Sequence, residues 1–465
     1  MRRRVVITGV GAVSGFGVGL PALWAGLVEG RSALRRLGLF DASGFPWRLG
    51  AEAAGFSARD HVPKHYRKAV KVMARDTELA VAAAGSAVSD AGLVTRVSAE
   101  EGTATTYPGE RLGCQIGAGL IAAEVGELAA AFSTAVVAGG GRTNGQEDWG
   151  GFDLRAWGTV KEAGGGGGME NLPPLWMLKY LPNMLACHVT ILHGAEGPSN
   201  TITCSESSGL LSIGESVRVI ERDDADACFS GGAESKLNPM GVLRIGLAGR
   251  LAETGDAEEG AGFVRPFDPE GKGTLLGEGG AVLILEEREA ARRRGARAYA
   301  EVAGFGASHS PGRWSGMDGP PAAVGDGADE GVRDAIINAL DDAAVGPGEI
   351  DAVVVGGLGV PWVDAGEAGA LREVFGDRVG EIELVTTKPA IGDSMAGEGA
   401  LLAAVGAACV REQRLPARLH AGRPAEGLRA GRAESRAAAL RHVLMCTPSL
   451  FGQVGAVVLR RVEGG

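Results

Sequence analysis

The sequence has little of what several common kinds of functional site require. Its six cysteines form no CxxC pair and its seven histidines are spread over 465 residues, so neither a zinc site nor a thioredoxin-like redox site is predicted. No apolar run reaches the roughly 18 residues of a membrane-spanning helix, so none is expected. Acidic residues (57) outnumber basic ones (46), and the net charge of −11 argues against nucleic acid or an anionic membrane surface as a partner.

The N-terminus does not have the composition of a targeting signal. Five glycines between Gly9 and Gly19 interrupt its apolar stretch, which favours a strand and tight turn over a signal peptide. Gly9 and Gly11 lack the third glycine of a dinucleotide-binding loop, and no cofactor of any kind is predicted. The scattered cysteines are typical of reduced thiols, so we expect a cytoplasmic protein.

Predicted strands and helices alternate along the chain. The strands are Arg4–Thr8, Leu112–Gly117, Asn200–Thr203, Asp226–Ser230, Ala281–Glu287, Ala298–Val302, Ala352–Val355, Glu383–Thr387 and Ala456–Arg460. The helices are Leu20–Glu29, Asp76–Ala91, Glu287–Arg294, Gly331–Ala344 and Met395–Arg411. This order predicts a mostly parallel or mixed α/β protein. The glycine-laden segment Gly139–Glu170 is predicted to be a surface loop or insertion.

The stretch Gly197–Glu234 has the order of a nucleophile turn. A short strand ends in small polar residues, an almost wholly apolar helical run follows, and a second strand ends at Gly231-Gly232. Such a turn places one side chain at a helix N-terminus, where free N–H groups and the helix dipole favour negative charge. Glu206 and Cys204 are the two candidates for that position.

This stretch, together with the segments Arg265–Asp268 and Gly277–Gly279, resembles the β-ketoacyl-acyl-carrier-protein synthases. These are the condensing enzymes of fatty-acid and polyketide synthesis, within the thiolase superfamily. The resemblance covers essentially the whole chain, and Gly139–Glu170 is its poorest part. It implies an α/β fold of the thiolase type, a five-layer αβαβα sandwich of two pseudo-symmetric halves, which we predict at residues 1–260 and 261–465.

The family's nucleophile is a cysteine on this turn, and the corresponding position here holds Glu206. Counting forward from Gly197-Pro-Ser199 and back from Gly231-Gly232 gives Glu206 both times without a gap. Cys204 would need a two-residue slip on each side, so we interpret it as a small, mostly buried strand residue.

The resemblance also locates two histidines that assist decarboxylation of the extender unit, and neither is present. Gly356 replaces the first and Asp393 the second, while the lysine near the second is kept as Lys388. The closing turn keeps Phe451, although two of the family's glycines beside it are replaced. No residue of this set suggests a metal ion.

These substitutions predict a scaffold that has lost its chemistry. All seven histidines lie away from the predicted site, and we interpret His188 and His193 as structural. The pattern resembles the chain-length factor, the inactive partner of the ketosynthase in bacterial type II polyketide systems, which commonly carries glutamine where this chain has Glu206. The leading hypothesis is a non-catalytic subunit that pairs with an active ketosynthase, shapes the acyl tunnel and meets the acyl carrier protein only indirectly.

Three other hypotheses stay open. The chain could prime synthesis as a malonyl-carrier decarboxylase, although the domains thought to do so keep histidines that are absent here. It could be a stand-alone homodimeric binding protein of the thiolase fold, or an ordinary condensing enzyme that works through Cys204. Glu206 itself either pairs with Lys388 in the relic pocket or is a tolerated polar residue without a role.

The resemblance implies a dimer, formed by central strands near the nucleophile turn. We predict that the apolar segment Leu172–Leu192 and the strand before Glu206 contribute to it.

The resemblance also implies a gate that limits how far the acyl chain extends. An alignment without gaps puts the gate at Ala123, Gly126 and Ala130, all of which are small and would leave volume for a chain. A one-residue gap would place Leu128 or Phe132 there instead.

Overall fold

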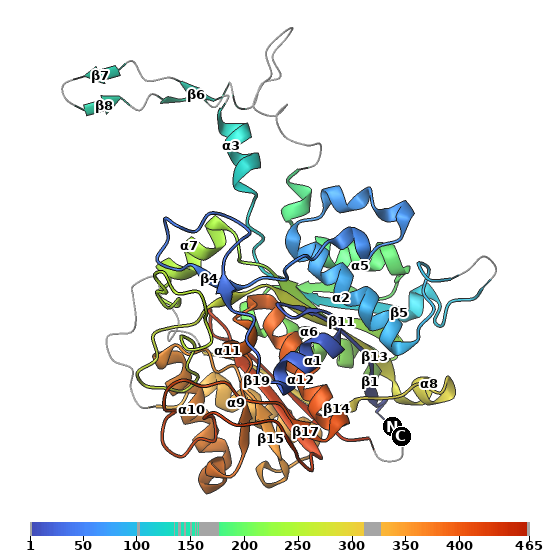
Figure 1. The fold of residues 1–465 in the computed structure, drawn as a ribbon. Helices are drawn as coiled ribbons and strands as arrows, with labels where there is room; N and C mark the ends of the chain where they lie inside the picture. The colour runs from blue at the N-terminus through green and yellow to red at the C-terminus, as the bar shows by residue number, and fades with distance from the viewer. Residues whose placement is uncertain are drawn as a thin grey trace.

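One long mixed sheet runs through the centre of the molecule (Figure 1). The computed structural model describes residues 2–99, 103–133, 176–310 and 327–462, with short stretches between 135 and 157. The sheet order is β10 (Ser199–Ile202), β5 (Leu112–Gly117), β11 (Ala227–Glu234), β13 (Gly279–Glu287), β1 (Val5–Ser14), β14 (Ala300–His309), β20 (Gln453–Arg460), β19 (His442–Pro448), β15 (Ala352–Val354) and β16 (Glu383–Val385). The short β2 (Gly17–Val18) pairs with β1 beside this path.

The sheet consists of two sets of five strands that repeat one arrangement. From the central contact between β1 and β14, each set continues with two antiparallel pairs and then two parallel pairs. β13, β11, β5 and β10 on one side therefore correspond to β20, β19, β15 and β16 on the other. This repetition confirms the two pseudo-symmetric halves.

Helices complete the five layers. The central layer is α6 (Ser208–Glu221) with α12 (Glu398–Glu412), which contact each other and both sets of strands. The first set is covered outside by α2 (Arg75–Ala91) and α5 (Met184–His193), the second by α9 (Glu330–Ala343) with α10 (Pro361–Phe375) packed on α9. The thiolase-like αβαβα sandwich is thus confirmed.

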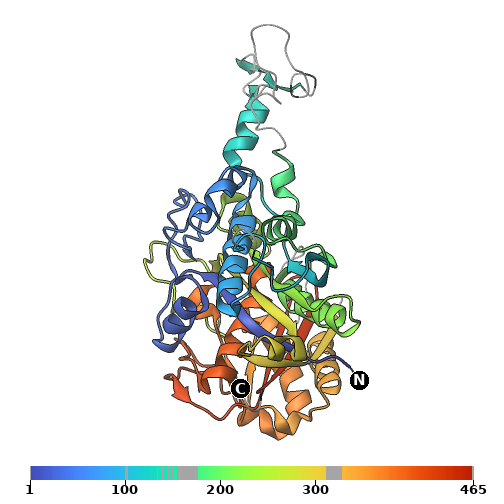
Figure 2. The same cartoon turned by 90° about the vertical axis from the view of Figure 1, so that its right-hand side faces the viewer.

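The remaining elements are short. The short helices are α1 (Leu20–Val28), α3 (Val125–Ser133), α7 (Pro239–Leu247), α8 (Arg288–Arg293) and α11 (Lys388–Ile391). The short strands are β3 (Arg35–Arg36), β4 (Leu49–Ala51), β6 (Val136–Val137), β7 (Gly141–Thr143), β8 (Gln146–Asp148), β9 (Gly151–Phe152), β12 (Leu276–Gly277), β17 (Arg414–Leu415) and β18 (Arg436–Ala437). The 3₁₀ turns are η1 (Ala58–Asp60), η2 (Lys64–Tyr66), η3 (Ala69–Val72), η4 (Gly109–Arg111), η6 (Leu178–Tyr180), η7 (Ser205–Ser207), η9 (Pro347–Glu349), η10 (Gly376–Gly380) and η11 (Met395–Gly397). The teal α3 rises away from the body in both views (Figures 1 and 2).

Two sequence-based expectations change. β13 lies between β11 and β1, so residues 279–287 belong to the first set of strands and the sheet does not divide between residues 260 and 261. Most of the predicted loop Gly139–Glu170 lies outside the described residues. The part that is described contains the pair β7–β8 and the strand β9, which pairs with β6 just before the segment.

The two central helices begin in the same way. Each follows a single 3₁₀ turn, η7 before α6 and η11 before α12, and each turn begins with a non-glycine residue in the left-handed region, Ser205 (φ 46°) and Met395 (φ 50°). Glycines let the two starts approach: a Cβ on Gly209 would lie 2.3 Å from the backbone nitrogen of Ala400. The close contact between the starts of α6 and α12 therefore fixes the position of η7 relative to η11.

Filling that contact should destabilise the protein. We expect Gly209→Ala to lower the free energy of unfolding by about 1–3 kcal/mol, because the added methyl group overlaps the backbone of α12. Gly85→Ala is the matched control, since its nearest neighbour would be 3.8 Å away; it should gain up to ~1 kcal/mol of helix propensity. Urea unfolding of both variants decides this, and a Gly209→Ala protein as stable as the parent would contradict the packing argument.

Candidate active site

The nucleophile turn holds Glu206 inside the protein. Glu206 lies in η7, directly before the buried helix α6, and is only 1% exposed. Cys204 lies two residues earlier and is half-buried, with its backbone N–H donating to the Ser208 hydroxyl at 2.8 Å. Burial raises the pKa of the Cys204 thiol, which disfavours the thiolate that a nucleophile needs.

Arg250 is the partner of Glu206. The two side chains form an ion pair with only 3% and 2% of their surfaces exposed, and the other carboxylate oxygen of Glu206 accepts a hydrogen bond from the Leu450 N–H at 2.8 Å. Sequence reasoning missed Arg250, which follows α7 and is 44 residues away along the chain. A buried carboxylate requires a cation nearby, but no local pattern says which arginine supplies it.

Lys388 does not pair with Glu206, contrary to one of the sequence-based hypotheses. Its ammonium group contacts Glu398 at 2.7 Å and Asp393 at 3.3 Å, and all three side chains are buried. These nearer carboxylates already satisfy the ammonium group. Burial opposes the charge, yet Asp393, Glu398 and the more weakly acting Glu206 raise the pKa of Lys388 above its usual value. Asp393, which the resemblance predicts at the second histidine position, thus helps to hold the lysine.

The predicted first histidine position, Gly356, contributes backbone groups only. The N–H groups of Gly356 and Gly357 donate to the two oxygens of buried Glu367, each at 2.9 Å. A Cβ on Gly356 would lie within 3.1–3.3 Å of Pro448, Glu367 and Thr447. The Thr447 carbonyl in turn accepts a hydrogen bond from Ser207 beside Glu206, so this loop and the nucleophile turn meet at the end of β19.

Neither the closing turn nor the histidines add a reactive group. The Phe451 side chain is 60% exposed, and its carbonyl contacts the His309 ring at 3.0 Å. His188 bonds to Tyr66 and His193 to Thr95, and burial lowers the pKa of His193 to about 4. These contacts agree with structural roles for the two buried histidines.

Within the described residues, no cluster of side chains suited to a metal ion occurs. No helix there is both long and apolar enough to cross a membrane.

Two family descriptions match most of the chain that carries Glu206, Arg250 and Lys388. The family description "Beta-ketoacyl synthase, N-terminal domain" matches residues 2–291, and "Beta-ketoacyl synthase, C-terminal domain" matches residues 299–422. The chain belongs to the β-ketoacyl synthase family. Within it, 3-oxoacyl-[acyl-carrier-protein] synthase 2 of Coxiella burnetii is 29% identical and covers 99% of both chains. The enzyme of the same name from Staphylococcus aureus strain COL is 27% identical, over 91% of this chain and 89% of its own.

Solved structures of β-ketoacyl synthases share the whole fold. The ishigamide ketosynthase/chain length factor superposes with a TM-score of 0.78 at 26% identity and covers 100% of both chains. A type II polyketide ketosynthase in complex with its acyl-carrier protein gives a TM-score of 0.76 at 20% identity, also over 100% of both chains. Both similarities agree with the sandwich described above.

Two of the three predicted tunnel residues line one cavity. Ala123 and Gly126 border a hollow of about 360 Å³ between the start of α2 and residues 235–239. Ala130 lies farther along α3, is half-buried and does not line the hollow. Leu128 is also half-buried, and Phe132 is 40% exposed and stacks on Trp157 with ring centroids 5.8 Å apart.

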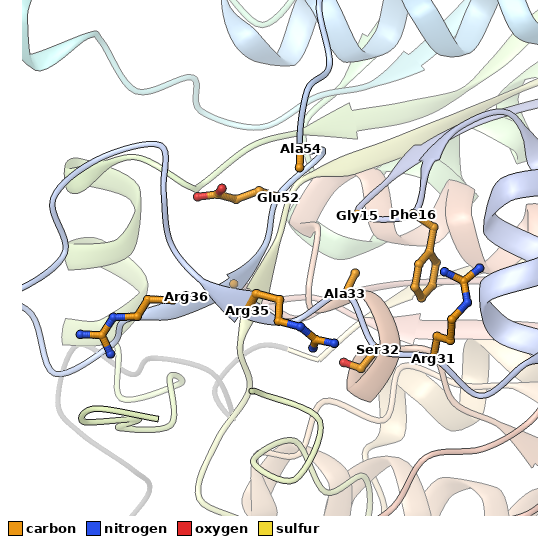
Figure 3. A pocket seen from close by; sticks show the side chains of 10 residues that line it. Gly15, Phe16, Arg31, Ser32, Ala33, Arg35, Arg36, Glu52 and Ala54 are labelled. Atoms are coloured by element: carbon orange, nitrogen blue, oxygen red, sulfur yellow. The ribbon is translucent and has the colours of Figure 1, made fainter. Parts of the chain in front are cut away.

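A second hollow, of about 470 Å³, lies at the surface beside β3 (Figure 3). Arg31, Arg35 and Arg36 line it, but their guanidinium groups do not converge on one point. All three already contact acidic side chains, namely Glu29, Glu259, Asp256 and Glu258. The hollow therefore offers little unpaired charge, and we assign no site to it.

Removing Arg250 alone should destabilise the protein more than removing the charges of Glu206 and Arg250 together. Arg250→Met leaves a buried carboxylate without its cation and should lower the free energy of unfolding by about 3–5 kcal/mol. Combined with Glu206→Gln, the same change should cost clearly less than the sum of the single losses. Denaturant unfolding of the four proteins measures this coupling, with exposed Arg222→Met as a control that should change little. Additive single losses would contradict the pairing.

Stability should fall between about pH 4.5 and 8 because of Glu367. Burial, against the backbone N–H groups, raises the pKa of Glu367 from 4.5 to about 8. Below this pH window Glu367 is protonated in both the folded and the unfolded protein. Within the window only the unfolded chain releases that proton, so the free energy of unfolding falls progressively as the pH rises. Glu367→Gln should therefore flatten the decline, whereas exposed Glu434→Gln should not. Thermal unfolding across the window checks this, and equal slopes in parent and Glu367→Gln would rule the assignment out.

Proposed function

We propose that this protein is a non-catalytic member of the β-ketoacyl synthase family, a chain-length-factor-like subunit that pairs with an active ketosynthase and shapes its acyl tunnel. The observation that carries the proposal is the buried pair of Glu206 and Arg250 at the nucleophile position. Acyl transfer needs a thiolate there, and a carboxylate would give only a labile mixed anhydride. This carboxylate is moreover occupied by a guanidinium group and by the Leu450 N–H.

The rest of the cluster supports inactivity. Decarboxylation of an extender unit needs groups that stabilise the developing enolate. Gly356 and Asp393 supply no imidazole, and Lys388 is held by two carboxylates. The same argument disfavours the alternative of a malonyl-carrier decarboxylase, and the raised pKa of Cys204 disfavours condensation through that thiol.

A pairing surface supports the subunit role. β10, the strand before Glu206, is the outermost strand of its set, and its residues Ser199 and Asn200 are exposed. An exposed edge strand is a template for pairing with another chain. Helix α5 contacts β10 and carries Ile191 (53% exposed), and Met177 (64%) and Leu181 (45%) just before α5 also expose apolar surface, as expected of an interface. A second copy of this chain, forming a homodimer, is the alternative partner for this surface.

The solved ketosynthase/chain length factor at 26% identity favours a ketosynthase as the partner over a second copy of this chain. We extend the proposal to a cytoplasmic location, because all six cysteines are free thiols, and to indirect contact with an acyl carrier protein.

The protein alone should form no acyl-enzyme. Intact-protein mass spectrometry after incubation with acyl thioesters should show no stoichiometric adduct, because the site holds neither thiol nor imidazole. Glu206→Cys should not condense malonyl units either, since Gly356 and Asp393 remain. Cys204→Ser serves as the control for adventitious labelling. A stoichiometric adduct that disappears in Cys204→Ser would overturn the proposed inactivity.

The subunit role is tested by co-expression with an active ketosynthase from the same organism. We expect the two proteins to co-purify as a heterodimer, and Gly126→Trp to shorten the products without breaking the complex. The Cβ position of Gly126 has no neighbour within 4 Å, so the large side chain can enter the hollow without disturbing the fold. Exposed Gly348→Trp in the second half is the control. An intact complex whose Gly126→Trp products keep their length would refute the tunnel role.

A further inference from the structure

Helix α3 and the strand pair β6–β9 form an arm that stands away from the body of the protein (Figures 1 and 2). The arm is joined to the body near the start of α3, where Glu127 contacts Lys179 at 2.7 Å and Tyr180 at 2.5 Å. At the far end of α3 the rings of Phe132 and Phe152 pack with centroids 5.5 Å apart, which ties the helix to β9. The name arm is used below for α3, β6 and β9.

The arm is too small to be stable without further packing. α3 has nine residues, and β6 and β9 have two each. An isolated helix shorter than about 12–15 residues is marginal in water, and so is an isolated two-stranded ribbon. The arm nevertheless exposes apolar side chains: Val136 (56%) and Phe152 (46%) lie opposite each other in the β6–β9 pair, and Val125 is 45% exposed. These side chains require a surface to cover them.

The direction of the arm indicates where that surface lies. The central sheet ends at β10 in the first set of strands and at β16 in the second. In both views the orange and red elements of the second set lie at the opposite end of the molecule from α3 (Figures 1 and 2). The arm therefore projects from the first set, the set whose outermost strand is β10.

Exposed apolar surface leads from the arm to β10. Glu127 of the arm contacts η6, which is followed by α5, and α5 contacts β10. Along this path Leu178 of η6 is 39% exposed and Ile191 of α5 is 53% exposed. A chain that pairs with β10 and covers α5 is therefore next to the base of the arm.

The edge strand alone is too short for a stable complex. A specific interface buries about 800 Å² on each partner and involves roughly 20–30 residues a side, whereas β10 has four residues. Aromatic side chains are enriched among the residues that contribute most to binding energy. The arm supplies both additional area and the exposed Phe152 ring.

We propose that the arm clasps the ketosynthase that pairs with β10, and that Val136 and Phe152 pack against the surface of that subunit. The inference rests on the proposed function, because it takes the active ketosynthase as the partner. It goes further by assigning a second contact surface, separate from the edge strand and from the site that holds Glu206.

The test measures the affinity of the purified protein for an active ketosynthase from the same organism. Val136→Ser combined with Phe152→Ser should raise the dissociation constant about tenfold or more, because two exposed apolar side chains no longer pack on the partner. Ile337→Ser is the matched control: Ile337 is 40% exposed on α9, in the second set, and its loss should change the constant by less than about twofold. Urea unfolding of each protein alone should be unchanged, since all three side chains are exposed.

Cross-linking identifies the chain that the arm contacts. The photoreactive amino acid p-benzoylphenylalanine in place of Val136 should join the protein to the ketosynthase, and the same amino acid in place of Ile337 should not. A complex whose affinity is unchanged by the two arm substitutions, no cross-link from position 136, or a cross-link only to a second copy of this chain would each overturn the inference. A parent protein that does not bind the ketosynthase would defeat the proposed function too, whereas a complex that forms without using the arm would defeat this inference alone.

Discussion

The buried pair of Glu206 and Arg250 is the interaction on which the centre of this protein depends. Removing two charges from water is costly, and it is tolerated only when each charge is paired and hydrogen-bonded. The carboxylate comes from the turn before α6, the guanidinium group from the segment after α7, and the additional N–H from Leu450 in the turn between β19 and β20. One side chain therefore joins three segments that belong to both halves of the sandwich.

The second charged group follows the same rule. Lys388 is enclosed by Asp393 and Glu398, so each of these two buried cations, Arg250 and Lys388, is held by a carboxylate of the same protein. A catalytic site keeps its donors free for charge that develops in the transition state. Here the donors are occupied before any substrate arrives. Under the proposed non-catalytic role, condensation would require removing these ion pairs as well as supplying a thiol and two imidazoles.

Much of the fold could be predicted because it depends on local pattern. The strand predicted at Leu112–Gly117 has the observed bounds, and the position of Glu206 follows from fixed motifs on both sides of it. Arg250 could not be predicted, because its role arises only when two loops 44 residues apart meet. The sheet does not divide at the predicted boundary between residues 260 and 261 for a related reason: the sequence predicts a strand at residues 281–287 but not the strands with which it pairs.

The left-handed residues at Ser205 and Met395 bear on the ancestry of the family. Such backbone costs of order 1–3 kcal/mol for a non-glycine residue, and it is usually associated with function. Met395, however, precedes no nucleophile position, yet it has the same conformation at the equivalent point of the second half. Duplication of an ancestral half would have copied this turn together with its sheet and central helix. The conformation at Ser205 is then part of the repeated architecture, so the strain of this turn does not by itself mark a site of chemistry.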